Sequence, residues 1–175
     1  MKIGIDVSQI TYGGTGVSAF ITSLIANLSK IDDKNEYVLF YSSLRRSFPV
    51  LEFKLSRNFK IKKFKFPPSF LDLLWNKLHM LPIEWLIGKV DVFITSDWTE
   101  PPTVMAQKAT FLYDLIVYKH PNETDKKIVE VQKRKLKWVK KGSKMVFCIS
   151  QATRKDAREV LGIEESRLKV IYPGV

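Results

Sequence analysis

The feature that most constrains this chain is a regular alternation of short apolar runs with longer amphipathic stretches. Buried strands of a parallel sheet read as short apolar runs, and the helices that cover them carry one apolar face. The runs that we expect to form strands are 2–7, 36–42, 90–96, 109–114, 144–150 and 168–172. The pattern predicts an α/β, Rossmann-like domain with a doubly wound, mostly parallel sheet and helices on both faces.

Helical periodicity begins directly after a glycine-rich loop. Apolar residues recur at helical spacing from Val17 to Leu28, which predicts a helix that starts near Gly16. Two more helices are expected at 122–141 and 151–161, because both stretches are amphipathic and rich in helix-forming residues.

The middle of the chain is less regular. Residues 50–56 and 60–66 both alternate apolar and charged residues, and we expect two half-exposed strands there. The stretch 67–88 should be helical, since a proline pair opens it, with an interruption at Pro82.

Composition narrows the class of protein. Apolar residues make up 45% of the 175 residues, so we expect one globular domain that spans 1–175. The chain contains no apolar run of about 18 residues, the length that a membrane-spanning helix needs, and its first residues lack the apolar core of a secretory signal. The only cysteine, Cys148, excludes an internal disulfide and points to the cytoplasm.

The charge balance favours anionic partners. Lys and Arg number 29 against 18 Asp and Glu, a formal charge of +11, which suits nucleotides, phospholipid surfaces or simply a well-solvated surface. The strongest basic runs lie in 60–70 and 125–141. The second is an amphipathic helix that could lie on an anionic membrane or pack its apolar side on the sheet, and we favour packing. No nucleic-acid partner is expected, because no RNA- or DNA-binding motif is present.

Four loops follow predicted strands. In doubly wound sheets, ligands bind beyond the carboxyl ends of the strands, and these ends lie at 8–15, 97–102, 113–118 and Ser150. Gly13 and Gly14 lie in the first loop and Gly16 follows it directly, so the backbone can approach a ligand closely at a helix N-terminus that attracts anions. The spacing of these glycines differs from the dinucleotide fingerprint. The loop therefore fits either a phosphate or sugar contact, or a turn with no ligand.

Three segments together resemble one known family. They are KIGIDVSQITYGGTGVSAFITSLIANL near the start, FLYDLIVYKHP at 111–121, and CISQATRKDAREVLGI followed by SRLKVIYPGV near the end. In this order they resemble the N-terminal domain of retaining glycosyltransferases with the GT-B fold, often called group 1 or family 4. The resemblance covers nearly the whole chain and is weakest over 43–90.

The resemblance implies a function. Such enzymes transfer a sugar from a nucleotide-sugar to an acceptor in the cleft between two Rossmann-like domains, usually without a metal. It implies that 1–175 is the N-terminal, acceptor-side domain, that the C-terminal donor-binding domain is absent from this chain, and that the chain alone is inactive or nearly so. A stand-alone sugar- or nucleotide-binding module without catalysis is the alternative.

The resemblance also implies partners and a location. The partners are the C-terminal domain, a nucleotide-sugar as co-substrate with no further cofactor, and a glycan or lipid-linked acceptor. The expected location is the cytoplasm, and the lipid-linked acceptors of many family members leave contact with the inner face of an anionic membrane as an open alternative. No metal is expected from the residues themselves, because His79 and His120 are far apart and Cys148 lies in a predicted strand.

Donor-side and catalytic candidates follow from the matched motifs. The resemblance places Gly14, Thr15 and Gly16 against the donor phosphate and sugar. Tyr113 stands where the family has a histidine that touches the donor sugar, and with Asp114 it forms the candidate catalytic pair. Tyrosine can still donate or accept a hydrogen bond but does not titrate near neutral pH. An aromatic residue at a strand end is the structural alternative for Tyr113, and a turn-closing carboxylate is that for Asp114.

Acceptor-side candidates are found in the loops after the predicted strands 2–7 and 90–96. They are Tyr12, Asp97, Trp98 and Glu100. An indole offers a flat face to a sugar ring and carboxylates bind hydroxyl groups, although a loop tryptophan also packs readily on a core. Ser150 and Thr153 match the family's Ser-x-x-Thr helix start, and we interpret Ser150 mainly as a helix cap.

Overall fold

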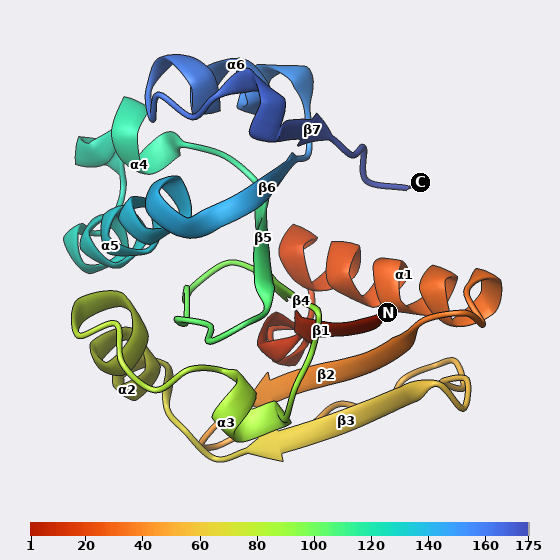
Figure 1. Cartoon of the computed structure of the whole chain (residues 1–175). Helices are drawn as coiled ribbons and strands as arrows, with labels where there is room; N and C mark the ends of the chain where they lie inside the picture. The colour runs from red at the N-terminus through yellow and green to blue at the C-terminus, as the bar shows by residue number, and fades with distance from the viewer. Residues whose placement is uncertain (175) are drawn as a thin grey trace.

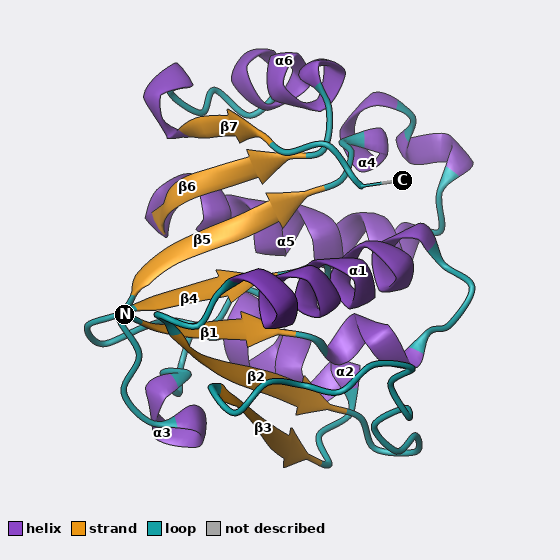
Figure 2. Cartoon of the chain, turned by 90° about the vertical axis from the view of Figure 1, so that its right-hand side faces the viewer, coloured by secondary structure: helices purple, strands orange, loops and turns teal. Residues whose placement is uncertain are grey.

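Seven parallel strands form one sheet in the computed structural model, which describes residues 1–174 (Figure 1). The strands are β1 (Lys2–Asp6), β2 (Glu36–Ser42), β3 (Phe59–Phe64), β4 (Val92–Thr95), β5 (Gln107–Leu112), β6 (Ser143–Cys148) and β7 (Leu168–Val170). Their order is β3-β2-β1-β4-β5-β6-β7. Successive strands are added on one side of β1 as far as β3 and on the other side from β4 onwards, so the strand order reverses between β1 and β4. Ligands of doubly wound sheets bind at this switch point. All arrows in Figure 2 point towards one edge, which carries the loops predicted to bind ligands.

Helices cover both faces of the sheet, as predicted. They are α1 (Gly16–Ile31), α2 (Pro68–Leu71) with a π-helical continuation (Asp72–Lys77), α3 (Glu84–Ile87), α4 (Ile116–Lys119), α5 (Lys126–Gly142) and α6 (Gln151–Glu159). Figure 1 shows α1 on one side of the strands and α2, α3 and α5 on the other. The Rossmann-like α/β class is therefore confirmed, with a sheet that is entirely parallel.

Burial on both faces explains why the strands read as continuous apolar runs. In β2, Leu39 packs among the buried residues beneath α1, whereas Phe40 packs on the opposite face with Trp75 of the π-helical segment. Every residue of β2 after Glu36 is buried. A strand covered on both sides needs apolar residues at every position, which removes the alternation typical of half-exposed strands.

One of the two strands predicted in the middle of the chain is absent. β3 forms and pairs with β2 as the edge of the sheet, but 50–56 contains no strand. Phe53 and Leu55 instead pack against the buried cluster beneath α1. The alternation there reflects the one-sided burial of a segment that crosses a face of the sheet, where no strand edge is available for pairing.

The helix boundaries follow local signals. The Thr15 hydroxyl accepts a hydrogen bond from the Ser18 amide at 3.2 Å, so α1 begins at Gly16 as predicted. The predicted interruption before Pro82 is present, because helical structure stops at Lys77 and resumes at Glu84. The basic helix α5 buries Val129, Leu136 and Val139 in the same cluster as Val146 and Cys148 of β6. Its apolar side therefore packs on the sheet.

A hydrogen-bonded carboxylate ends α1. Asp32 accepts a bond from the Asn35 side-chain amide at 2.7 Å and one from the Tyr37 hydroxyl at 2.6 Å. These bonds favour the ionised form and hold the pKa of Asp32 far below its ordinary value of 3.8.

This depressed pKa predicts a pH dependence of stability. Asp32 stabilises the fold above its unfolded-state pKa of about 3.9, and this contribution is lost as the pH falls. We expect the free energy of unfolding to fall less for Asp32→Asn than for wild type between about pH 5 and pH 3, as measured by urea denaturation. Asp33→Asn, at an exposed neighbour with no hydrogen bond among the described residues, should behave as wild type. Identical pH dependence in both variants would contradict this assignment.

Candidate active site

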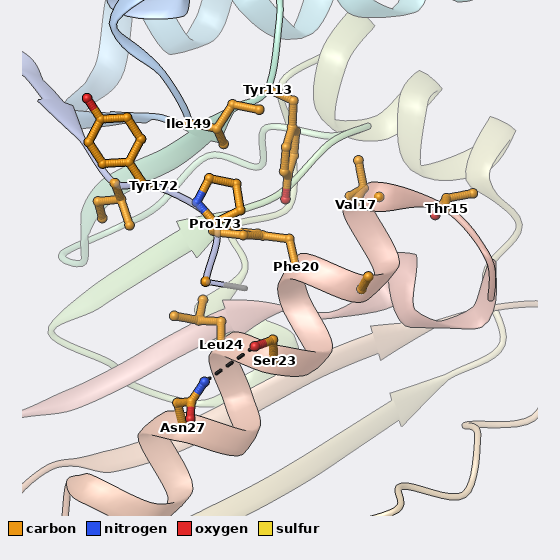
Figure 3. Close-up of a pocket in the computed structure, with 14 residues that line it drawn as sticks. Thr15, Val17, Phe20, Ser23, Leu24, Asn27, Tyr113, Ile149, Tyr172 and Pro173 are labelled. Carbon is orange, nitrogen blue, oxygen red and sulfur yellow. Dashed lines mark hydrogen bonds between the residues drawn. The ribbon is translucent and has the colours of Figure 1, made fainter.

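A groove of about 620 Å³ opens at the carboxyl edge of the sheet (Figure 3). It is lined by Thr15, Gly16, Val17, Ala19, Phe20, Ser23, Leu24, Asn27, Tyr113, Ile149, Ile171, Tyr172, Pro173 and Gly174. Residues 16–27 of α1 form one wall, and the segment after β7 forms the other. The structure thus brings Thr15 and Gly16 of the glycine loop together with Tyr113.

Tyr113 is fixed by contacts from two other elements. Its ring packs edge-on against Phe20 of α1, with centroids 5.8 Å apart, and its hydroxyl lies 3.2 Å from the Ser96 hydroxyl after β4. Burial raises the pKa of Tyr113 above its ordinary value of 10.0. The phenol therefore remains protonated at neutral pH and offers a neutral hydrogen-bonding group at the groove.

The glycine loop leaves the start of α1 open. Gly14 has a φ of +83°, in the left-handed region that favours glycine. A Cβ added at Gly16 would meet no atom within 4 Å, so the space beside it is free. Among the described residues, no acceptor pairs with the backbone N–H of Gly16 or Val17. Unpaired N–H groups at a helix start are suited to an anion.

A hydrogen bond links the loop after β5 to the start of α6. The Thr153 hydroxyl donates to the Tyr113 carbonyl at 3.0 Å, and the Ser150 hydroxyl accepts from the Thr153 amide at 3.0 Å. Ser150 is thus the N-cap of α6, as we favoured. The Asp114 carboxylate accepts from the Ile116 amide at 3.0 Å and closes the turn after β5, and Asp114 does not line the groove.

Two acceptor-side candidates meet in a separate, smaller cavity. Tyr12 and Trp98 both line a space of about 20 Å³ next to Asp6 at the end of β1. A cavity of this size has room for about one water molecule. Tyr12 is 37% exposed, so it can contact a ligand from its open side.

Buried charges lie beneath this part of the edge. The Gln132 side chain donates to the Asp97 carboxylate at 3.1 Å, and Lys135 of α5, only 2% exposed, donates from Nζ to the Ser96 carbonyl. Burial raises the pKa of Asp6 and of Asp97 and lowers that of Lys135, while the attraction between these opposite charges acts the other way.

The position of Glu100 corrects our expectation of an acceptor contact. Glu100 is 0% exposed, its carboxylate lies 3.3 Å from Lys108 Nζ, and it accepts a bond from the Ser143 hydroxyl at 2.8 Å. Because Glu100 has no exposed surface, its carboxylate is not accessible to a ligand. Glu100 instead connects the end of β4 to β5 and β6.

Sequence reasoning missed Asp6, Gln132 and Lys135. Asp6 carried one usable signal, since it is an acid at the end of an otherwise apolar strand. Gln132 and Lys135 lie in a helix that is rich in charged residues, and nothing in their spacing marks Lys135 as buried or Gln132 as a partner of Asp97. Lysine is rarely buried unless it is paired, so only the hydrogen bond from Lys135 to the Ser96 carbonyl after β4 reveals its role.

Comparison with known families gives an independent result. The family model described as Glycosyltransferase Family 4 matches residues 14–175, which include Gly16, Tyr113 and the Ser150-capped helix. This chain belongs to glycosyltransferase family 4. The family 4 assignment makes it a transferase domain. A search of curated proteins gives no match.

Two further observations describe this family 4 domain. Among residues 1–174, no helix combines the length and apolar character needed to cross a membrane. In the same range, no three His, Cys, Asp or Glu side chains are grouped so that they could hold a metal ion.

Proposed function

We propose that this domain is the N-terminal, acceptor-side half of a retaining GT-B glycosyltransferase, which moves a sugar from a nucleotide-sugar to a glycan or lipid-linked acceptor. The observation that carries the proposal is the shared groove of Gly16 and Tyr113. It joins a helix start suited to a phosphate with a neutral hydroxyl suited to a sugar.

The chemistry follows from where charge develops. Departure of a nucleoside diphosphate builds negative charge on the leaving oxygen, and the free N–H groups of Gly16 and Val17 can stabilise it. The protonated hydroxyl of Tyr113 can hold a donor-sugar hydroxyl in place. Tyr12, Asp97 and Trp98 lie on the acceptor side, where the loops after β1 and β4 come together.

The residues that line the groove also favour the proposal of a second, donor-binding domain. None of the described residues that line it carries a charged side chain. A diphosphate brings negative charge that amide N–H groups alone neutralise only in part, so basic groups must come from elsewhere. A C-terminal domain facing this groove would supply them, and the domain alone would then be inactive or nearly so.

Transfer assays test this proposal. We expect no detectable transfer from a panel of nucleotide-sugars by residues 1–175 alone, and transfer by the same domain joined to its C-terminal domain. The anomeric configuration of the product, read by NMR, should match that of the donor. Robust turnover by residues 1–175 alone would contradict the proposal that transfer needs both domains. Binding of nucleotide-sugar with no transfer by either protein would favour a binding module.

We also propose that the domain works in the cytoplasm and touches the inner face of the membrane. The support is the formal charge of +11 and a buried, free thiol at Cys148. Flotation with liposomes that contain anionic lipid tests the contact. Binding that weakens as salt rises is expected, and an absence of salt-sensitive binding would remove the membrane from the proposal.

A further inference from the structure

A second pocket, of about 430 Å³, lies apart from the groove at the carboxyl ends of β2 and β3. Four basic side chains line it, Arg45 and Arg46 from the loop after β2, Lys63 from β3, and Lys65 just beyond it. These loops are on the edge towards which the arrows of Figure 2 point, the same edge that carries the groove.

These four cations have no counter-ion among residues 1–174. The pocket lining includes no Asp or Glu, and none of the four takes part in an ion pair within the described range. Other basic residues do find partners, such as Arg134 with Asp72 at 2.7 Å. Like charges gathered at one pocket repel each other, and an anion bound among them removes that repulsion.

The loop that presents the arginines is held in place from below. The hydroxyl of Tyr41, a residue only 2% exposed, lies 2.9 Å from both the Arg46 and the Ser47 carbonyl oxygens. Phe48 packs edge-on against the Tyr41 ring, and Lys63 Nζ lies 5.2 Å from the centroid of the Phe48 ring. The cations are therefore attached to an ordered framework anchored in the core.

The pocket adjoins the acceptor side of the candidate active site. The Arg46 guanidinium donates to the Thr11 carbonyl at 2.8 Å and lies 5.2 Å from the centroid of the Tyr12 ring. Tyr12 is an acceptor-side candidate, and the loop that contains it continues to Thr15 and Gly16 in the groove. A ligand held at the pocket would thus extend towards the site of transfer.

We propose that this pocket binds a phosphate or diphosphate group carried by the acceptor. Guanidinium groups recognise phosphate oxygens through paired hydrogen bonds, and lysines add positive charge. The remaining walls include the apolar side chains of Leu44 and Phe64, which suits an anion attached to a less polar group. The inference that the pocket binds an anion follows from the pocket alone, whereas the assignment of that anion to the acceptor rests on the proposed function.

Titration of the ¹⁵N-labelled domain with inorganic pyrophosphate tests the site. Chemical shifts should change first for residues 43–48 and 63–65. The double variant Arg45→Gln/Lys63→Gln should weaken binding by about tenfold. The control Lys127→Gln/Lys155→Gln removes the same charge from two exposed positions outside the pocket and should change affinity less than about twofold. Equal weakening in the two double variants, or shifts centred on 15–17, would overturn the proposal.

Larger probes identify the source of the phosphate. Tighter binding of geranyl diphosphate than of pyrophosphate supports a lipid-linked acceptor, and tighter binding of a sugar 1-phosphate than of inorganic phosphate supports a phosphorylated glycan. Preferential binding of a nucleoside diphosphate at this pocket would overturn the acceptor assignment. Pyrophosphate binding here without any transfer by the two-domain protein would refute the proposed function and leave the anion site standing. Sugar transfer by the two-domain protein without pyrophosphate binding at this pocket would refute the anion site and leave the proposed function standing.

Discussion

Replacing Glu100 by alanine is expected to lower the free energy of unfolding by about 3–5 kcal/mol. Its carboxylate is fully buried and lies 3.3 Å from Nζ of Lys108, which is itself only 7% exposed. Alanine would leave that ammonium inside the protein without its counter-charge, and would also remove the acceptor of the Ser143 and Thr95 hydroxyls. Urea denaturation at neutral pH measures the loss.

Two variants separate burial from charge. Glu100→Gln keeps the size and some hydrogen bonds of the side chain but removes the charge, so its loss should be smaller than that of alanine. Glu123→Ala removes an exposed carboxylate, 73% accessible and paired with His120, and should cost less than about 1 kcal/mol. If Glu100→Ala were as stable as Glu123→Ala, Glu100 would again be a candidate for ligand binding.

Gly16→Leu is expected to lower kcat/KM for sugar transfer by about 100-fold in the two-domain protein while leaving stability close to wild type. The fold should tolerate the change, because a Cβ at Gly16 meets no atom within 4 Å. The added side chain would occupy the groove beside Thr15 and Tyr113 and displace the donor from the helix start.

Gly13→Leu is the matched control. Gly13 also has free space around its Cβ position and lies in the same loop, but it does not line the groove. Its kcat/KM should stay within about threefold of wild type, and thermal unfolding should show both variants folded. Equal activity of the two variants would show that the donor does not pass Gly16.

The sheet was predictable from the sequence because most of its strands are covered on both faces. Such strands read as short apolar runs, and β1, β2 and β6 were found in this way. The edge strand β3 and the crossing segment 50–56 both alternate, yet only β3 pairs with a neighbour. Alternation reports that one side is buried, and it cannot tell whether a strand edge lies beside the segment.

The candidate site was predictable where it depends on strand ends and helix starts. Thr15, Gly16 and Tyr113 are local features of the loops after β1 and β5, and they meet in one groove. Glu100 and Lys135 were not predictable, because their burial depends on contacts with other elements. Lys135 reaches the Ser96 carbonyl, 39 positions earlier in the chain, and Glu100 meets Ser143, 43 positions later. The residues next to Glu100 and Lys135 in the sequence show no pattern that predicts these contacts.

The segment after β7 forms one wall of the groove through Tyr172 and Pro173. A displacement of this segment changes the width of the groove at once, since α1 on the opposite side is fixed to the sheet. A ligand that fits best at one width stabilises the segment at that position, and holding the segment there strengthens the binding of that ligand to the same degree. Occupancy of the groove and the path of the chain beyond β7 are therefore thermodynamically linked.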